Sequence, residues 1–316
     1  MTLKRALPEV RRKEATMAVT HPMATVLSSD IDSRSVRAWV TAHPTCSFFL
    51  GAYVFAWTLW TPAVLGFDGS LGMALFFVGV FGPMTAAAMV IHLSGGSARA
   101  WAHDIFHVRF HRGWWLYAVG LPFGIAATAS VGFVLAGHTL DFDLVGEHLA
   151  ALLPLLAITF FVNGGPEEPG WRGFALPRLQ ERLTPVQATL VLGVLWALWH
   201  LPLLAIEDNP SHGLGTWPFA GTAALFVVGV VLYAFPYTYL WNHTKSAVAA
   251  MALHAGFSTS LAVVILRDEE DLVEGAYVGM QVSQTVVLLA VAAALIVLTR
   301  GHLGRRPSQP EADTGG

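Results

Sequence analysis

The stretch Asn163-Gly-Gly-Pro-Glu-Glu-Pro-Gly-Trp-Arg-Gly-Phe174 places two adjacent carboxylates and an arginine between long apolar segments that contain almost no charge. An unpaired ionisable group inside a bilayer or at its edge is energetically costly, so such groups are usually paired and functional. Glu167 and Glu168 therefore mark a candidate functional site. Arg172, four residues after Glu168, is their expected partner through a charge-assisted hydrogen bond.

Two prolines flank the acidic pair and predict its local structure. Glu168 precedes Pro169, and a residue before proline is steered away from helical dihedral angles, so the pair is expected at a helix break. Pro169 suits the first turn of a new helix running to about Leu183, which would put both carboxylates beside the positive end of the helix dipole. Two adjacent acids held in different surroundings can then take different catalytic roles.

The composition of the whole chain is that of a membrane protein. Of its 316 residues 54% are hydrophobic and 12% are charged, and the mean hydropathy is +0.56. We predict an all-α fold, a polytopic membrane helical bundle of about eight transmembrane helices, because eight apolar segments approach the length needed to cross ~30 Å of hydrocarbon. These segments are 46–66, 71–93, 114–136, 149–165, 186–206, 219–241, 246–266 and 277–299.

The distribution of loop charges predicts the orientation, because Lys and Arg concentrate on the cytoplasmic side. With both termini cytoplasmic, only Arg267 lies on the wrong side. The basic residues expected in cytoplasmic loops are Arg99, Arg109, Arg112, Arg172, Arg178, Arg182, Lys245, Arg300, Arg305 and Arg306. The expected location is the plasma membrane, with multiple passes.

The same pattern divides the chain into three parts. Residues 1–43 contain seven Lys and Arg and no long apolar core, so we predict a polar, basic, disordered tail rather than a cleaved signal peptide. Residues 44–300 form the predicted transmembrane domain, with its motifs within 150–265, and residues 301–316 form a second disordered tail. The bilayer is therefore an expected partner of the chain.

Charge and cysteine content exclude several classes of function. A net charge of -3 without a basic patch excludes nucleic acid as a partner. The single cysteine, Cys46, excludes an internal disulfide framework and a cysteine-based zinc ribbon. The sequence carries no signal for an oligomeric state.

Two histidines in separate apolar segments complete the candidate site. His200 follows Trp196 by four residues, so the indole is expected to pack against the imidazole, and Ser258 follows His254 at the same spacing. We predict that Glu167, His200 and His254 share a polar pocket between helices and activate a water for attack on a carbonyl. Ser258 would help His254 donate hydrogen bonds to the developing oxyanion.

Taken together, these segments resemble the three motifs of the CPBP family of intramembrane proteases, which includes the CAAX prenyl endopeptidases. The motifs are Glu167-Glu168-x-x-x-Arg172, then Trp196-x-x-x-His200, then His254, and the resemblance covers roughly residues 150–265. It implies peptide-bond hydrolysis of a protein or peptide substrate in a helical cavity open to the cytoplasm.

The resemblance also implies a role for each residue. Glu167 and Glu168 would be the catalytic acids, Arg172 their orienting partner, and His200 and His254 the contacts to a water or a metal. Two positions depart from the family pattern: Trp196 stands where Phe is usual, and Ser258 stands where Asn is usual. A divalent metal such as zinc, held by Glu167, His200 and His254, and a metal-free glutamate base are both compatible with these residues.

One difficulty concerns the depth of these residues in the membrane. If the fifth span begins at its inner end near residue 186, His200 lies about 20 Å from that end, whereas Glu167 lies near the inner face. The two meet only if the fourth helix ends deep in the bilayer or the spans bend.

Two other functions stay open. His103, His107 and His111 recur every four residues, so a helix would bring neighbouring pairs onto one face, as in a metal sensor or transporter. A membrane-surface helix with histidines at the headgroups explains the same spacing. The third alternative is a catalytically silent relative that keeps the fold as a membrane scaffold or immunity-type protein.

Overall fold

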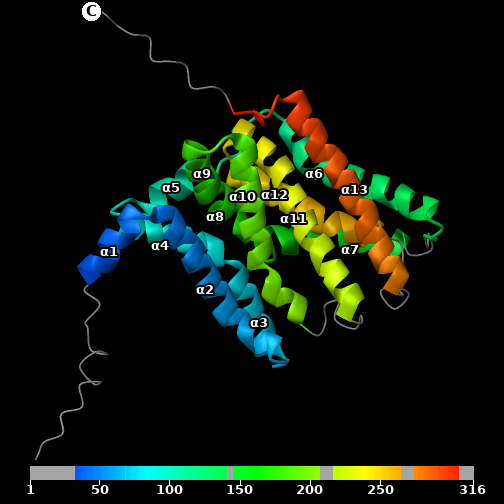
Figure 1. Cartoon of the computed structure of the whole chain (residues 1–316), viewed down its shortest axis with the longest axis horizontal. Helices are drawn as coiled ribbons and strands as arrows, with labels where there is room; N and C mark the ends of the chain where they lie inside the picture. Colours follow the sequence, from blue (N-terminus) through cyan, green and yellow to red (C-terminus); the bar gives the residue numbers. More distant parts are fainter. Residues whose placement is uncertain are drawn as a thin grey trace, which may run out of the picture.

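The computed structural model describes residues 33–305, except 68, 141, 143–144, 207–215 and 265–273. Most of both predicted tails, residues 1–32 and 306–316, lies outside this range. The described residues form helices and contain no strand (Figure 1). The helices are α1 (Ser33–Ala42), α2 (Pro44–Val64), α3 (Ser70–Val80), α4 (Gly82–Leu93), α5 (Ala98–Ile105), α6 (Gly113–Leu135), α7 (Val145–Phe161), α8 (Glu168–Gly170), α9 (Leu176–Arg182), α10 (Pro185–Trp199), α11 (Thr216–Thr244), α12 (Ala247–Val264) and α13 (Glu274–Leu298).

The predicted polytopic helical bundle is confirmed. In the described part of the chain six helical segments are long and apolar enough to cross a membrane, and α3 with α4, bent by 50°, gives a seventh if the pair is one span. The six segments are 44–64, 113–135, 149–182, 185–205, 220–244 and 278–298. α12 coincides with the predicted span 246–266 but is not in this set. The count of eight and the cytoplasmic termini therefore stay predictions.

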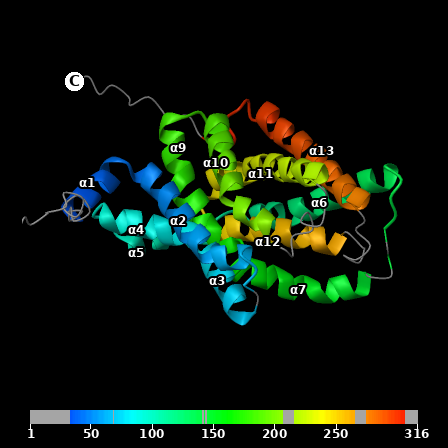
Figure 2. The ribbon, with the colours of Figure 1, turned by 60° about the horizontal axis from the view of Figure 1, so that its bottom comes forward.

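The motif-bearing helices lie in the middle of the bundle. α12 packs against α6 and α7, and α10 packs against α11, which in turn packs against α13. Figures 1 and 2 show α8 to α12 between the α1–α5 group on one side and α6, α7 and α13 on the other. Many apolar side chains on the outer helices are exposed, such as Leu116, Leu135 and Leu298, which suits contact with lipid.

A tight turn between α9 and α10 determines how far along the bundle the acidic motif lies from the second motif. Thr184 and Gln187 form a capping box at the start of α10, and Pro185 occupies the first helical turn. Residues 168–182 are helical up to this turn, so they are not the cytoplasmic loop that the charge pattern predicted. Arg172 is fully buried within this helical segment. That part of the loop prediction was wrong because Arg172 is paired inside the protein.

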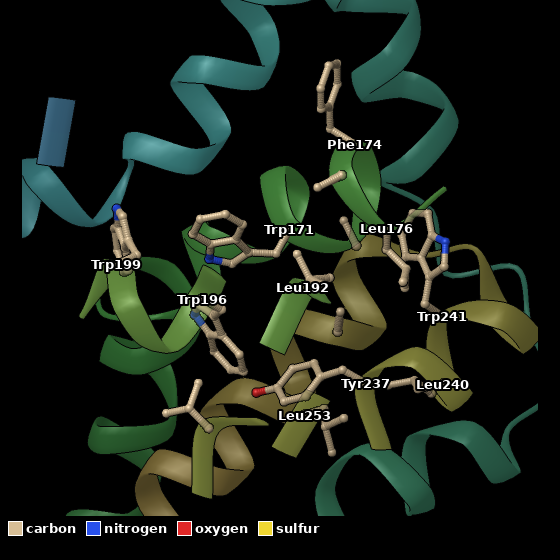
Figure 3. Packing of buried hydrophobic residues seen from close by; sticks show 14 of the residues in the cluster. Trp171, Phe174, Leu176, Leu192, Trp196, Trp199, Tyr237, Leu240, Trp241 and Leu253 are labelled. Atoms are coloured by element: carbon tan, nitrogen blue, oxygen red, sulfur yellow. The ribbon is translucent and has the colours of Figure 1, made fainter. Parts of the chain in front are cut away.

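Aromatic side chains fill the centre of the molecule (Figure 3). The Trp171 ring lies edge-on to Phe48 at 5.4 Å and to Trp199 at 5.7 Å between centroids, and Trp60 lies 4.5 Å from Trp199. Lipid supplies no hydrophobic force between helices, so van der Waals packing of this kind holds a membrane bundle together. The cluster fixes α2, α8 and α10 around the acidic motif.

The start of the C-terminal tail is part of the packed structure. Leu303 is fully buried, and Asn242 of α11 donates a hydrogen bond to its carbonyl at 2.8 Å. Arg305 donates to the backbone carbonyl of Gln180 at the end of α9. The disordered tail predicted from residue 301 therefore begins too early, because residues 301–305 pack against α9 and α11.

Candidate active site

The acidic pair lies directly after a break between helices, but Glu167 and Glu168 both have right-handed helical dihedral angles. The expectation that Pro169 steers Glu168 away from these angles was therefore wrong, and the chain turns at Gly164 instead. α7 ends at Phe161, a 3₁₀ turn covers Gly165–Glu167, and α8 begins at Glu168. Gly164 has φ of +102°, and a β-carbon at this position would enter the ring of His254. Glycine is required here for both its conformation and its small size. The break brings the backbone before Glu167 against the third motif.

A π-helical turn follows the acids, at Trp171–Ala175. The N–H of Leu176 donates to the carbonyl of Trp171, five residues back. Pro177 has no N–H to donate to the carbonyl of Gly173, which instead accepts from the Trp101 indole at 3.1 Å. Single π turns inside helices recur at functional sites.

The α9–α10 turn brings Glu167 and His200 to the same depth. Glu167 precedes Arg182 by 15 residues, and His200 follows Pro185 by 15 residues. Since helical residues rise by about 1.5 Å each, both side chains lie at a similar distance from the turn. The depth difficulty disappears because the two helical segments meet at a turn near residue 183, not near Glu167.

Glu167 is bound through one of its two carboxylate oxygens. Its Oε2 accepts hydrogen bonds from the indole N–H groups of Trp171 at 3.2 Å and Trp196 at 2.7 Å. The side chain is buried, and its Oε1 has no hydrogen-bond partner among the residues that the structure describes. These two donors stabilise negative charge on Oε2 and leave Oε1 available to a ligand or a water.

His200 faces Glu167 with its Nε2 atom. Its Nδ1 lies 2.8 Å from the carbonyl of Trp196, and because a carbonyl only accepts, Nδ1 carries the proton of the neutral ring. The Nε2 atom therefore presents a lone pair, 3.9 Å from Oε2 of Glu167. That distance is too long for a direct hydrogen bond, and at such distances a water often lies between the two groups.

Glu168 is enclosed by a different set of partners. Nη1 of Arg172 lies 3.0 Å from both of its carboxylate oxygens, and Nδ1 of His254 lies 2.8 Å from Oε1. The Arg172 guanidinium lies between the rings of Trp196 and Tyr237, with Cζ at 4.2 and 4.0 Å from their centroids. These cation–π contacts help to stabilise a buried guanidinium whose Nε and Nη2 make no hydrogen bond in the described structure.

A cavity of about 210 Å³ opens beside these groups. Its polar lining comes from Trp196, His200, Tyr233, Tyr237, His254 and Ser258. Ser258 is exposed, so its hydroxyl is accessible. The structure thus brings the second and third motifs to one cavity and places Glu167 beside His200. All six predicted site residues lie in this one region.

The proposed metal ligands do not form a three-ligand set. Within the described ranges no group of three or more His, Cys, Asp or Glu side chains is arranged to hold a metal ion. Donors of the right chemical type are present, but their arrangement does not fit a metal bound by Glu167, His200 and His254.

The histidine run lacks the predicted geometry. α5 ends at Ile105, so only His103 lies in the helix. The rings of His107 and His111 accept from the backbone N–H groups of Arg109 at 3.3 Å and Gly113 at 3.1 Å. They stabilise the turns between α5 and α6 and gather no metal site in the described residues.

Sequence reasoning missed three contributors to the site. Trp196 was expected only to pack on His200, yet its indole donates to Glu167. Trp171 gives the second donor, and its position four residues after Glu167 was an available signal. No motif pointed to Tyr237.

Comparisons with known proteins agree with this geometry. A family model described as type II CAAX prenyl endopeptidase Rce1-like matches residues 149–260. A Methanococcus maripaludis protein named CAAX prenyl protease 2 is 23% identical over 269 residues, which cover 79% of this chain and 92% of the relative. The matched segment contains all six predicted site residues. Over residues 149–260 the chain is therefore similar to the Rce1-like type II CAAX prenyl endopeptidases.

Proposed function

We propose that this protein is an intramembrane endopeptidase in which Glu167 and His200 activate a water for hydrolysis of a peptide bond. The similarity to Rce1-like CAAX prenyl endopeptidases supports the general activity. The observation that carries the mechanism is the 3.9 Å separation between Nε2 of His200 and Oε2 of Glu167. Nε2 is an acceptor when His200 is neutral, and Oε1 of Glu167 has no partner among the described residues. A water with two protons to donate therefore fits between the imidazole and the carboxylate.

The reaction then follows from the roles of these two groups. The water oxygen attacks the carbonyl carbon of the substrate while Glu167 takes a proton from the water. The tetrahedral intermediate collapses, the carbon–nitrogen bond breaks, and the proton held by Glu167 passes to the leaving nitrogen. The products are a new carboxyl group and a new amino group.

Glu168 and Arg172 support this reaction without contacting the water. Glu168 fixes the ring of His254 by accepting from Nδ1, which leaves Nε2 as the nitrogen available to a substrate. Arg172 neutralises Glu168 and is in turn held between two aromatic rings. Glu167 is thus the base, and Glu168 and Arg172 are positioning residues. We assign no step to a metal, because the described residues contain no group of three ligating side chains arranged around one point.

The substrate class follows from the relative. The Methanococcus maripaludis protein is named CAAX prenyl protease 2, so the first substrate to test is a prenylated C-terminal peptide. We place the protein in the plasma membrane and expect the cavity to open to the cytoplasmic side, as the loop charges predict.

The test uses purified full-length protein and an internally quenched, farnesylated peptide that ends in cysteine, two aliphatic residues and methionine. The wild type should cleave it, and Glu167→Gln should lose activity by about 10³-fold or more, since it removes the base. Glu181→Gln is the control, because Glu181 is an exposed glutamate on α9 that makes no contact with the site.

A second arm uses the same peptide without the farnesyl group, to show whether the lipid is required. Proteomics of peptides released in cells carrying wild-type or Glu167→Ala protein would then identify natural substrates. If the wild type and Glu167→Gln are equally inactive on all peptides, the proposal fails and the non-catalytic scaffold is favoured.

A further inference from the structure

We infer that Tyr237 is a further catalytic residue, whose hydroxyl donates a hydrogen bond to the oxyanion that forms when the substrate carbonyl is attacked. This inference rests on the proposed peptide hydrolysis and adds a residue to it. Tyr237 lies in α11, outside the three motifs that contain the acids and histidines.

Tyr237 is held rigidly beside the candidate water site. Its side chain is 1% exposed. Its ring stacks on the Arg172 guanidinium at 4.0 Å and lies 5.5 Å from the Trp196 ring and 6.0 Å from the His254 ring between centroids. Figure 3 shows the ring extending from its helix away from Leu240, with the hydroxyl toward the side of Trp196. The aromatic contacts therefore fix where the hydroxyl points.

The hydroxyl itself has no partner in the described structure. Tyr237 has ring contacts but makes no hydrogen bond to any described residue. Its oxygen is also not one of the fully buried side-chain atoms without a hydrogen-bond partner, so the hydroxyl is accessible. The residue lines the 210 Å³ cavity together with His200 and His254. A polar group buried to this extent normally has a hydrogen-bond partner. An accessible donor aimed into a reaction cavity is suited to bind a substrate atom.

The other tyrosine on the cavity wall shows the contrast. Tyr233 lies one helical turn earlier on α11 and also lines the cavity. Its hydroxyl is bonded to the side-chain amide of Gln284 on α13. Gln284 donates this hydrogen bond, so the Tyr233 oxygen is held toward α13. Of the two tyrosine hydroxyls at the cavity, only that of Tyr237 makes no hydrogen bond to a described residue.

The third motif of this chain differs from the family pattern in a way that suggests a chemical role for the Tyr237 hydroxyl. Ser258 stands where the family usually has asparagine, and its side chain is shorter by one carbon and carries a single donor. A developing oxyanion is best stabilised by donors already in place at the cavity wall. The Tyr237 O–H on α11 supplies such a donor at the cavity that Ser258 on α12 also lines. It keeps its own proton throughout, so the atom balance of the hydrolysis is unchanged.

The test compares Tyr237→Phe with the wild type in the farnesylated-peptide assay. Phenylalanine keeps the ring between Arg172 and the cavity, so the fold and the aromatic contacts should be retained. Loss of one oxyanion donor should lower kcat by about 100-fold while KM changes by less than about twofold. Tyr239→Phe is the matched control, because Tyr239 lies on the same helix with its ring against Trp114 and His243, outside the cavity.

A second measurement separates oxyanion stabilisation from a structural effect. A phosphonate peptide resembles the tetrahedral intermediate, so Tyr237→Phe should bind it about 100-fold more weakly than the wild type does. Binding of the unreactive product peptide should not change, and neither should the unfolding temperature. The inference fails if Tyr237→Phe keeps wild-type kcat and phosphonate affinity, or if only KM rises, while Glu167→Gln is still inactive. If the wild type cleaves no peptide, the proposed hydrolysis fails and this inference with it.

Discussion

Glu167 and Glu168 are neighbours in the sequence but differ in almost every contact. Glu167 has one oxygen held by two indoles and one without a partner in the described structure. Glu168 has no exposed surface and is enclosed by Arg172 and His254. Consecutive residues of a helix point about 100° apart, so adjacent acids reach different surroundings. The comparison teaches that two adjacent acids can be held in different ways, and the proposed function assigns Glu167 as the reactive group and Glu168 as the structural one.

The largest effect should come from removing the structural acid. Glu168→Ala leaves the buried Arg172 guanidinium without its counter-charge, which should cost about 3 to 5 kcal/mol of folding free energy and much of the folded yield. Thermal unfolding in detergent measures this loss. Glu167→Gln should unfold within about 2 °C of the wild type, because a glutamine keeps an acceptor for the indoles.

A double variant sharpens that prediction. Glu168→Leu with Arg172→Met replaces both charges by apolar groups, which should recover most of the lost stability. Activity should stay low, because His254 loses the acceptor for its Nδ1 proton. Full recovery of activity in the double variant would contradict the positioning role given to Glu168.

A smaller effect should follow loss of one indole donor to Glu167. Trp196→Phe installs the residue that the family usually has there, keeps an aromatic ring over Arg172 and removes the 2.7 Å hydrogen bond. We expect about a 10-fold fall in kcat, in line with a net hydrogen-bond contribution near 1.4 kcal/mol. Trp60→Phe is the control, because it also removes a buried indole hydrogen bond, in this case to Phe76. Equal activity in both variants would contradict the role of Trp196.

The smallest effect is expected from metal removal. Because no three ligating side chains of the described residues gather around one point, dialysis against EDTA should change the cleavage rate by less than about twofold. Metal analysis of the active protein before and after dialysis provides the check. Inactivation that is reversed by zinc would show that Glu167, His200 and His254 rearrange around an ion.

The sequence predicted the helical class, a break beside the acidic pair and the side chains that the structure brings together. Hydropathy predicts the class because it requires no tertiary contact, and the glycines and prolines of the motif act locally. The sequence wrongly counted Arg172 as a loop charge, because a carboxylate pairs with it inside the protein. The roles of Trp171 and Tyr237 depend on contacts between helices, which a single sequence without a motif at these positions does not encode.

The two segments that meet at the α9–α10 turn, 167–182 and 185–200, are equal in length, and this has a consequence for bilayers of different thickness. Helical membrane proteins adjust to hydrophobic mismatch by tilting or shifting along the membrane normal. Since Glu167 and His200 are each 15 residues from the same turn, a shift of the whole hairpin carries both by the same amount. The distance between the acid and the imidazole therefore does not depend on bilayer thickness. Inserting a single residue into only one of the two segments would change that distance.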